Sequence, residues 1–315
     1  MPVSDSMPGD VQLLHRALTT LHNPTQSYTT LHLSNCGTAM RFLTAYAAQL
    51  ENKVTILDGV ERMHHRPIGQ LVDALREIGA DIEYLGKEGF PPLRIKGCIL
   101  DKHRIVTINN PQSTQFVSAM LLIGANAQTN STSPYITLTR ELIQRYTTLD
   151  NSTQRYTIEK DWSSAAFWYE YVALHGGEIT LPGIYRNSLQ GDKIVADIFT
   201  HLGVYTEYTA EGLTLSPHRL IASSPFAYNF SNCPDLYPAV AITCERLGVE
   251  LHATGVESLP LKESDRLLAV REHRTDADHR MAMALLIAGY AVDDTDCICK
   301  SYPQFLEEYG NLLGQ

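Results

Sequence analysis

The sequence contains no long run of apolar residues. A membrane-spanning helix needs roughly 18 consecutive apolar residues, and none of the 315 positions begins such a run. The first residues, Met1–Ser6, have neither the basic stretch nor the apolar stretch of a secretory signal peptide. We therefore expect a protein without a membrane-spanning segment, located in the cytoplasm.

Paired cysteine spacings are also absent. The six cysteines include only two that lie close together, Cys297 and Cys299. A single C-x-C is a weak metal signal, and the C-x2-C spacing of zinc sites does not occur. We expect six reduced thiols.

Positive charge is scarce as well. The chain has 25 Lys and Arg residues and 35 Asp and Glu residues, which gives a net charge of -10. This balance disfavours nucleic acid as a partner.

Against this acidic background, arginines lie at loop–helix junctions. The segment Asn35–Arg41 is a small polar loop that opens a helix, and Arg62 and Arg66 precede a second helix. A helix N-terminus presents free N–H groups and a positive dipole end, which favour an anion. The guanidinium group of arginine binds carboxylate or phosphate through two parallel hydrogen bonds. The pattern indicates a small anionic substrate.

The chain repeats a unit of helix, strand, helix and two strands. One copy runs from residue 38 to residue 96, and another from 163 to 215. Gly79 and Gly203 are separated by 124 positions, and so are Tyr84 and Tyr208. Shared residues at one offset indicate a duplicated unit.

Further copies are expected to start at Ser113, Asp235 and Asp278, and residues 11–33 resemble half of a sixth copy. The copies predict an α/β (α+β) protein of two lobes, each of three units, with a site in the cleft between them. We assign residues 1–155 to the first lobe and 156–315 to the second. The helix starts are 75, 50, 72 and 43 residues apart, so the second and fourth copies lack room for the closing strand pair.

Ten short segments, in the same order along the chain, resemble the enolpyruvyl transferase family, and specifically 3-phosphoshikimate 1-carboxyvinyltransferase (EPSP synthase). They are residues 35–41, 66–75, 89–93, 113–116, 161–165, 187–192, 234–235, 261–266, 278–283 and 300–303. The resemblance implies an inside-out α/β barrel of two lobes, here truncated. It also implies transfer of the enolpyruvyl group from phosphoenolpyruvate to the 5-hydroxyl of shikimate 3-phosphate, with release of phosphate, on the pathway to chorismate and the aromatic amino acids. The resemblance implies no metal or organic cofactor, and a monomer.

The resemblance also assigns residues to roles. Matched positions imply phosphoenolpyruvate binding by Asn35, Gly37, Arg66, Arg266, Arg280 and Lys300. Ser113, Thr114 and Gln115 would hold the phosphate of shikimate 3-phosphate, although Ser and Thr here are also ordinary helix caps. Asp235 and Lys262 would lie at the reacting hydroxyl, and Glu263 would donate a proton. Desolvation in a closed cleft would raise the pKa of Glu263. His279 is either a packed residue or a member of the site.

Three departures from the family pattern matter. The family opens with a Gly-Ser-Lys-Ser segment that contacts both substrates, and no such segment occurs here. The family's Ser-Arg-Pro-Tyr segment falls near residues 140–146, where only Arg145 and Tyr146 match. Only 13 positions separate Arg266 from His279, too few for a helix end and a strand pair.

These departures keep two alternatives open. The first is a lapsed or truncated family member that binds an anionic ligand without turnover. The second is UDP-N-acetylglucosamine enolpyruvyl transferase, which would need a catalytic cysteine after the second unit begins, whereas Cys98 lies before it.

Overall fold

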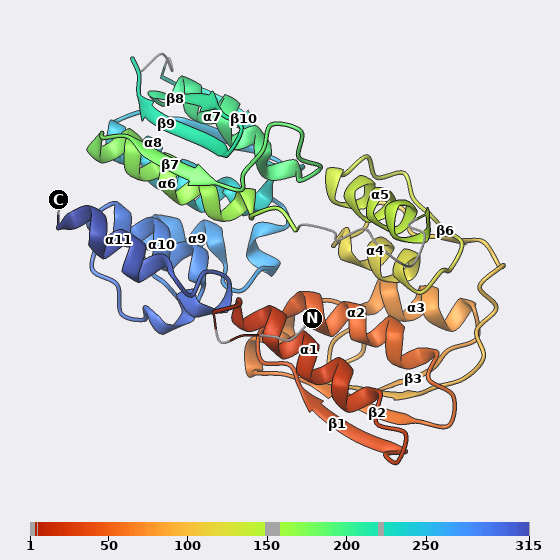
Figure 1. Cartoon of the computed structure of the whole chain (residues 1–315). Coiled ribbons are helices and arrows are strands. Elements are labelled where there is room, and N and C mark those ends of the chain that lie inside the picture. The colour runs from red at the N-terminus through yellow and green to blue at the C-terminus, as the bar shows by residue number, and fades with distance from the viewer. Residues whose placement is uncertain (1–3, 5, 149–157, 220–223, 315) are drawn as a thin grey trace. The chain divides into compact units, whose positions relative to one another are not determined.

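The chain is described by a computed structural model, which covers all residues except 1–3, 5, 149–157, 220–223 and 315 (Figure 1). It divides into two compact units, Met1–Leu149 and Asp150–Gln315. Within the described ranges, no helix is long and apolar enough to cross a membrane. All six cysteines are free thiols.

The first unit is built on a four-stranded mixed sheet. Its strands are β1 (Tyr28–His32), β2 (Val54–Asp58), β3 (Asp81–Tyr84) and β4 (Leu93–Lys96). They lie in the order β1-β2-β4-β3, with β1 parallel to β2 and the other neighbours antiparallel. Alternate residues of β2 and β4 are buried, as the period of a half-covered strand requires.

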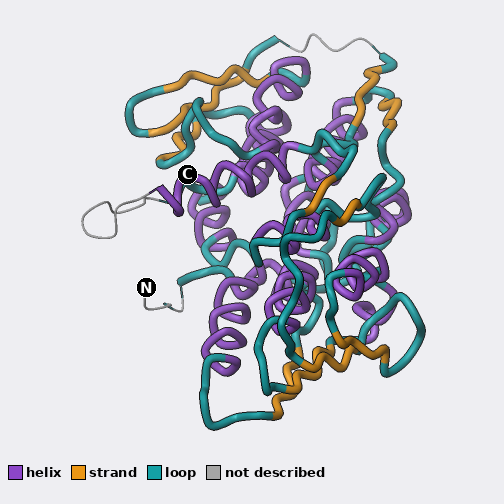
Figure 2. Tube along the Cα trace, turned by 90° about the vertical axis from the view of Figure 1, so that its right-hand side faces the viewer, coloured by secondary structure: helices purple, strands orange, loops and turns teal. Residues whose placement is uncertain are grey.

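Helices cover one side of this sheet. They are α1 (Gly9–Leu21), α2 (Gly37–Ala48) and α3 (Gly69–Glu77). Helix α4 (Gln115–Leu122) packs on α2 and α3, and α5 (Pro134–Thr148) packs on α4. The short strands β5 (Val106–Thr107) and β6 (Ala127–Gln128), which precede and follow α4 in the chain, pair in parallel. The helices of this unit lie on the same side of its sheet (Figures 1 and 2). Most of α2 is buried because it packs on the sheet and also on α4. The N-termini of α2 and α4 thereby come close together.

The second unit repeats this plan in a three-stranded sheet. Its strands are β7 (Ile179–Pro182), β8 (Val204–Tyr208) and β9 (Gly212–Pro217), in the order β7-β9-β8 with both neighbours antiparallel. Helix α6 (Trp162–His175) precedes β7, and a 3-10 turn η2 (Gly191–Ile194) leads into α7 (Val195–His201). Gly79 and Gly203, which precede β3 and β8, both have positive φ, +102° and +92°. The two glycines therefore share one backbone conformation at corresponding places, directly before a strand.

The other elements of the second unit are smaller. A parallel pair, β10 (Phe226–Asn229) and β11 (Leu251–Thr254), flanks η3 (Pro234–Leu236) and α8 (Tyr237–Leu247). Then follow η4 (Leu259–Leu261), α9 (Arg266–Glu272), α10 (His279–Ile287), η5 (Asp296–Lys300) and α11 (Phe305–Leu313). Helices α6, α8 and α10 contact one another. The large side chains of α6, Trp162 and Phe167 among them, are buried in the core.

Two segments that depart from the family pattern, residues 266–279 and 140–146, are wholly or partly helical in the structure. Residues 266–279 hold α9 and the start of α10, and no strand lies between these two helices. Residues 140–146, where the sequence analysis placed the counterpart of a substrate-binding segment, form the middle of α5. That helix was not predicted from the sequence.

Candidate active site

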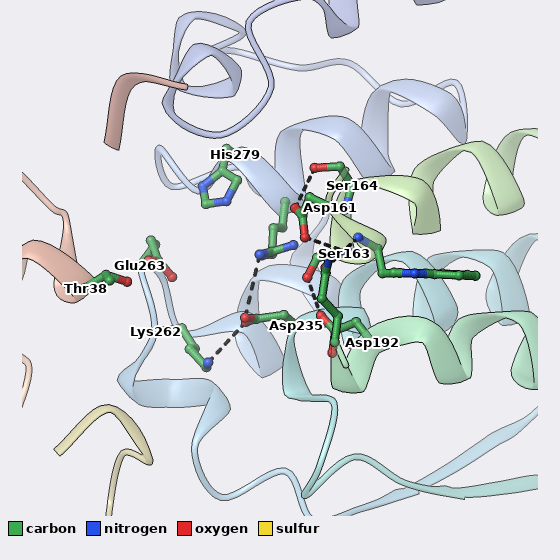
Figure 3. A network of polar contacts seen from close by, with 12 residues as sticks. Thr38, Asp161, Ser163, Ser164, Asp192, Asp235, Lys262, Glu263 and His279 are labelled. Carbon is green, nitrogen blue, oxygen red and sulfur yellow. Dashed lines mark hydrogen bonds and ion pairs between the residues drawn. The ribbon is translucent and has the colours of Figure 1, made fainter. Parts of the chain in front are cut away.

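Three acidic residues mark the helix starts at one end of the second unit. Asp161 caps α6 by accepting from Ser163 N–H (3.1 Å) and Ser164 N–H (3.2 Å). Asp278 caps α10 by accepting from Arg280 N–H (3.0 Å). Asp235 lies in η3, directly before α8. A carboxylate at a helix N-terminus satisfies free N–H groups and complements the dipole. Because α6, α8 and α10 pack together, their starts form one polar cluster (Figure 3).

Arg266, the first residue of α9, is the centre of this cluster. Its side chain is completely buried, and its nitrogens face three carboxylates. Nε donates to Asp278 (2.8 Å), Nη1 to Asp235 (2.7 Å) and Nη2 to Glu263 (3.0 Å). Burial opposes the charged form, but these carboxylates outweigh it and raise the pKa of Arg266 further. In this arrangement Arg266 binds the protein's own carboxylates, whereas the sequence analysis predicted that it binds phosphoenolpyruvate.

Asp235 lies among three cations. Lys262 Nζ is 3.1 Å from Oδ1, Arg266 Nη1 shares that oxygen, and Arg280 Nη2 is 3.6 Å from Oδ2. Burial by itself would raise the pKa of Asp235, but Lys262, Arg280 and Arg266 hold that pKa well below its ordinary value. The carboxylate is therefore ionised at neutral pH, and its side chain remains 23% exposed.

Glu263 lies on the other side of Arg266. Its Oε2 accepts from Arg266, and its Oε1 is 3.2 Å from Lys300 Nζ. The Glu263 and Lys300 side chains are 13% and 16% exposed, so both reach solvent. Two nearby cations favour the ionised form of a carboxyl. To act as a proton donor, Glu263 would first need to lose part of this cationic environment.

His279, at the start of α10, is held neutral. Burial, together with the nearby charges of Arg280 and Lys300, lowers its pKa to about 3. Among the described residues its Nδ1 has no hydrogen-bond partner. At neutral pH the ring is therefore uncharged and resists protonation, so it can form hydrogen bonds but cannot serve as an imidazolium acid.

Besides the helix cap Asp161, two carboxylates of this cluster were not assigned from the sequence. Asp192 in η2 is buried and accepts a hydrogen bond from the Ser163 hydroxyl (Figure 3). Asp278 is buried beside Arg266. Both fall inside the matched segments 187–192 and 278–283. An acidic residue directly before a helix is a recognisable cap, so the sequence carried a signal for Asp278.

In the first unit, two arginines converge on the start of α2. Arg66 Nη1 donates to the backbone oxygen of Asn35 (3.0 Å) and to its Oδ1 (3.3 Å). Arg41 Nη1 donates to Gln115 Oε1 (3.2 Å), and Gln115 Nε2 donates to Thr38 Oγ1 (2.9 Å). Both arginines are buried. A guanidinium pair at a helix N-terminus is an arrangement suited to phosphate or carboxylate.

Ser113 and Thr114 lie in the loop that enters α4. Both are partly exposed, and Ser113 Oγ accepts from Gln115 N–H at 3.4 Å. Thr114 is the residue before the helix, and its side chain makes no capping hydrogen bond. The structure therefore brings Ser113, Thr114 and Gln115 to one helix start, whereas Gln115 alone reaches across to α2.

The residues predicted for the site thus fall into two groups, one in each unit. The first-unit group is Asn35, Gly37, Arg66, Ser113, Thr114 and Gln115. The second-unit group is Asp235, Lys262, Glu263, Arg266, His279, Arg280 and Lys300. Three cations of the second-unit group reach solvent: Lys262, Arg280 and Lys300. Each of them is paired with a carboxylate. Cations beside partly exposed carboxylates can bind an anion and also exchange protons with it.

Comparison with known proteins identifies the family. The sequence model for EPSP synthase (3-phosphoshikimate 1-carboxyvinyltransferase) matches residues 9–273 and 271–309. The chain belongs to the EPSP synthase family. A 3-phosphoshikimate 1-carboxyvinyltransferase of Bacteroides fragilis is 35% identical over 359 residues, covering 95% of this chain and 85% of the relative. One of Colwellia psychrerythraea is 31% identical, with 90% and 79% covered. These relatives do not favour the UDP-N-acetylglucosamine alternative.

Solved structures show the same fold. EPSP synthase from Acinetobacter baumannii aligns with a TM-score of 0.61 at 20% identity, covering 90% of this chain and 78% of that one. The enolpyruvyl transferase NikO from Streptomyces tendae aligns with a TM-score of 0.51 at 14% identity, covering 88% and 75%. The EPSP synthase fold, an inside-out α/β arrangement, is therefore the fold of this chain. The 359-residue alignment exceeds 95% of the 315 residues by about 60 positions, so the relative is longer within the aligned region.

Proposed function

We propose that this EPSP synthase family member transfers the enolpyruvyl group of phosphoenolpyruvate to the 5-hydroxyl of shikimate 3-phosphate. The observation that carries the proposal is the pairing of Asp235 and Glu263 through Arg266, with Lys262 and Lys300 on the outer sides. Such a pair places two partly exposed carboxylates and the ammonium groups of Lys262 and Lys300 where one anionic reactant could meet them. The names of the relatives supply the reaction.

The reaction needs two proton movements, and the second-unit group offers a residue for each. The hydroxyl oxygen of shikimate 3-phosphate adds to C2 of phosphoenolpyruvate, and the methylene carbon of phosphoenolpyruvate gains a proton. The product of this step is a tetrahedral intermediate. Loss of a methyl proton and of phosphate then restores the double bond. We assign Asp235 and Lys262 to the hydroxyl and Glu263 to the carbon, since Asp235 is ionised and Glu263 reaches solvent.

The ion pair between Lys300 and Glu263 suggests how Glu263 becomes an acid. A phosphate or carboxylate that binds Lys300 competes with Glu263 for the same ammonium group. When Glu263 loses that partner, its ionised form loses stabilisation and protonation becomes easier. Substrate binding would therefore prepare the donor. Lys300 and Arg280 would bind phosphoenolpyruvate, as would Arg66 and Asn35 of the first unit.

We assign the loop at Ser113 and Thr114 to the phosphate of shikimate 3-phosphate, together with Gln115. The two hydroxyls are partly exposed, and the free N–H groups of α4 begin there. We further propose that the enzyme works in the cytoplasm as a monomer, since both clusters are made by a single chain.

Phosphate release with both substrates, each omitted in turn, tests the proposal. Release that requires both substrates supports the transferase. Tight binding of shikimate 3-phosphate without release would identify a lapsed family member. The matched variants are Glu263→Gln and Glu272→Gln, since Glu272 is an exposed glutamate at the end of α9. We expect Glu263→Gln to lower kcat by roughly 10²- to 10⁴-fold while calorimetric binding of shikimate 3-phosphate persists. Full activity in that variant would refute the assigned donor.

A further inference from the structure

Asp278 is buried where the loop before α9 meets the start of α10. Its side chain is 0% exposed, and it does not reach the solvent-facing part of the cluster. Its Oδ2 accepts from Arg266 Nε (2.8 Å) and from the Ser264 hydroxyl (3.1 Å). Its Oδ1 lies 3.4 Å from Arg266 Nη2 and accepts the capping hydrogen bond from Arg280 N–H. One carboxylate thus joins the loop, the buried arginine and the helix start.

These contacts use one edge of the guanidinium. Asp278 takes the Nε–Nη2 edge of Arg266 in the two-pronged manner that fixes the plane of the group. The remaining hydrogens of Nη1 and Nη2 are then directed to Asp235 and Glu263. Rotation of Arg266 about its long axis would break both of those contacts together.

We propose that Asp278 is a positioning residue, which fixes the orientation of Arg266 and thereby the placement of Asp235 and Glu263 relative to each other. It touches neither substrate. Its effect passes through Arg266, whose ends fix the two carboxylates, and through Arg280, whose backbone it caps. This inference rests on the proposed function, because Asp235 and Glu263 matter only if they exchange protons with the substrates.

The geometry sets the size of the expected effect. An arginine that is held on one edge only by packing can tilt, and a misplacement of about 1 Å at a reacting group can cost roughly 10²-fold in rate. Asp278→Asn keeps the shape and keeps a good helix cap. However, the amide replaces one acceptor oxygen by a donor that faces the N–H groups of Arg266. The variant therefore tests orientation with little change to α10.

The kinetic experiment is a double-mutant cycle on the phosphate-release assay. We expect Asp278→Asn to lower kcat by about 100-fold with KM for phosphoenolpyruvate changed less than about threefold. In the Arg266→Lys background the same change should alter kcat less than about twofold, because a residue that acts through Arg266 adds nothing once Arg266 is gone. Losses that multiply, or a wild-type kcat in Asp278→Asn, would overturn the proposal.

Two controls keep the test decisive. Asp265→Asn changes the cap of α9, where Asp265 accepts from Leu268 N–H, and it should leave kcat unchanged. If Asp278→Asn does not fold, Ser264→Ala removes only the hydroxyl that donates to Asp278. That variant should still lower kcat several-fold, and a wild-type kcat in it would count against the proposal.

A spectroscopic measurement separates this inference from the proposed function. In protein labelled with ¹⁵N-arginine, the Arg266 Nε–H signal, identified by its loss in Arg266→Lys, should be protected from solvent exchange. It should lose that protection in Asp278→Asn and keep it in Asp265→Asn. This result does not require turnover, so an inactive wild-type chain would remove the proposed function and leave the positioning role tested. Equal protection in Asp278→Asn would refute it.

Discussion

The guanidinium groups of Arg41 and Arg66 lie against the backbone of Gly37, in the space that a side chain at this position would occupy. A Cβ atom on Gly37 would overlap Arg41 Nη1 and would lie 2.5 Å from Arg66 Nη2. A methyl group there would therefore require both guanidinium groups to move, although the φ of Gly37 is not in the left-handed region. The placement of both arginines in the first-unit cluster therefore depends on the absence of a side chain at Gly37.

Gly37→Ala should consequently displace both arginines. We expect kcat/KM for phosphoenolpyruvate to fall by about 100-fold, chiefly through KM, since the arginines are assigned to binding. Steady-state kinetics measures this effect. Gly310→Ala is the control, because a Cβ there meets open space in α11. A Gly37→Ala enzyme with unchanged KM would separate the arginines from substrate binding.

Removing Arg266 should destabilise the second unit. Arg266→Met leaves Asp235, Glu263 and Asp278 without their shared buried cation, and loss of one partner of a buried ion pair typically costs about 3–5 kcal/mol. Urea unfolding at pH 7 measures the change. Arg271→Met, on the exposed side of α9, should alter stability by less than about 0.5 kcal/mol. A cost below about 1 kcal/mol for Arg266→Met would show that the three carboxylates relax without it.

Glu170 in α6 should make the protein less stable as the pH rises. Its carboxyl is completely buried, and neither oxygen has a hydrogen-bond partner within the described part of the chain. Burial raises the pKa of Glu170 well above its ordinary value of 4.5. The folded state keeps the proton while the unfolded chain releases it above pH 4.5, so stability falls as the pH rises past that value.

Glu170→Gln removes this titration. Between pH 5 and pH 8 the wild type should lose about 1–3 kcal/mol more stability than the variant, measured by urea unfolding at both pH values. Glu178→Gln, at an exposed position before β7, should behave as the wild type does. Parallel pH curves for wild type and Glu170→Gln would contradict a protonated Glu170.

His279 should act in the opposite direction. Its pKa is about 3 in the folded protein and 6.5 in the unfolded chain, so the unfolded state binds the additional proton. Stability is then lost as the pH falls from 6.5 towards 3, with a slope of at most about 1.4 kcal/mol per pH unit. His279→Gln should flatten thermal stability over that range, whereas His201→Gln, at an exposed position, should not. An unchanged slope in His279→Gln would mean that the imidazole is charged when folded.

Much of the fold was predictable because its units repeat. Strand β8 (Val204–Tyr208) lies within the copy predicted for residues 163–215, and the glycine before it follows the end of α7. Strand β10 was missed for a physical reason, whereas helix α5 was missed although its sequence carries a signal. Strand β10 has four residues and depends on pairing with β11, so its partner decides it more than its own sequence does. Helix α5 begins at Pro134, which is a recognisable helix start.

The candidate site was predictable as a set of residues but not as a set of contacts. The matched segments contain every residue assigned to the two clusters. They do not tell a substrate-binding arginine from one whose nitrogens are taken by three carboxylates. That distinction for Arg266 depends on burial and on the approach of Asp235 and Asp278 from two other helix starts. The residue types are local information, whereas their pairing is a property of the packed helices.

The short connection between α9 and α10 bears on how this centre forms. Arg266 and Asp278 are only 12 positions apart, and no strand separates them. The entropy lost on closing a loop grows with its length, so an ion pair across so few residues closes at low cost. Contacts between residues that are close in sequence also form quickly, because they do not require a distant segment of the chain to come into place first. The buried core of the charge cluster is therefore a local structure, able to assemble early in folding and to present Arg266 to Asp235 when α8 docks.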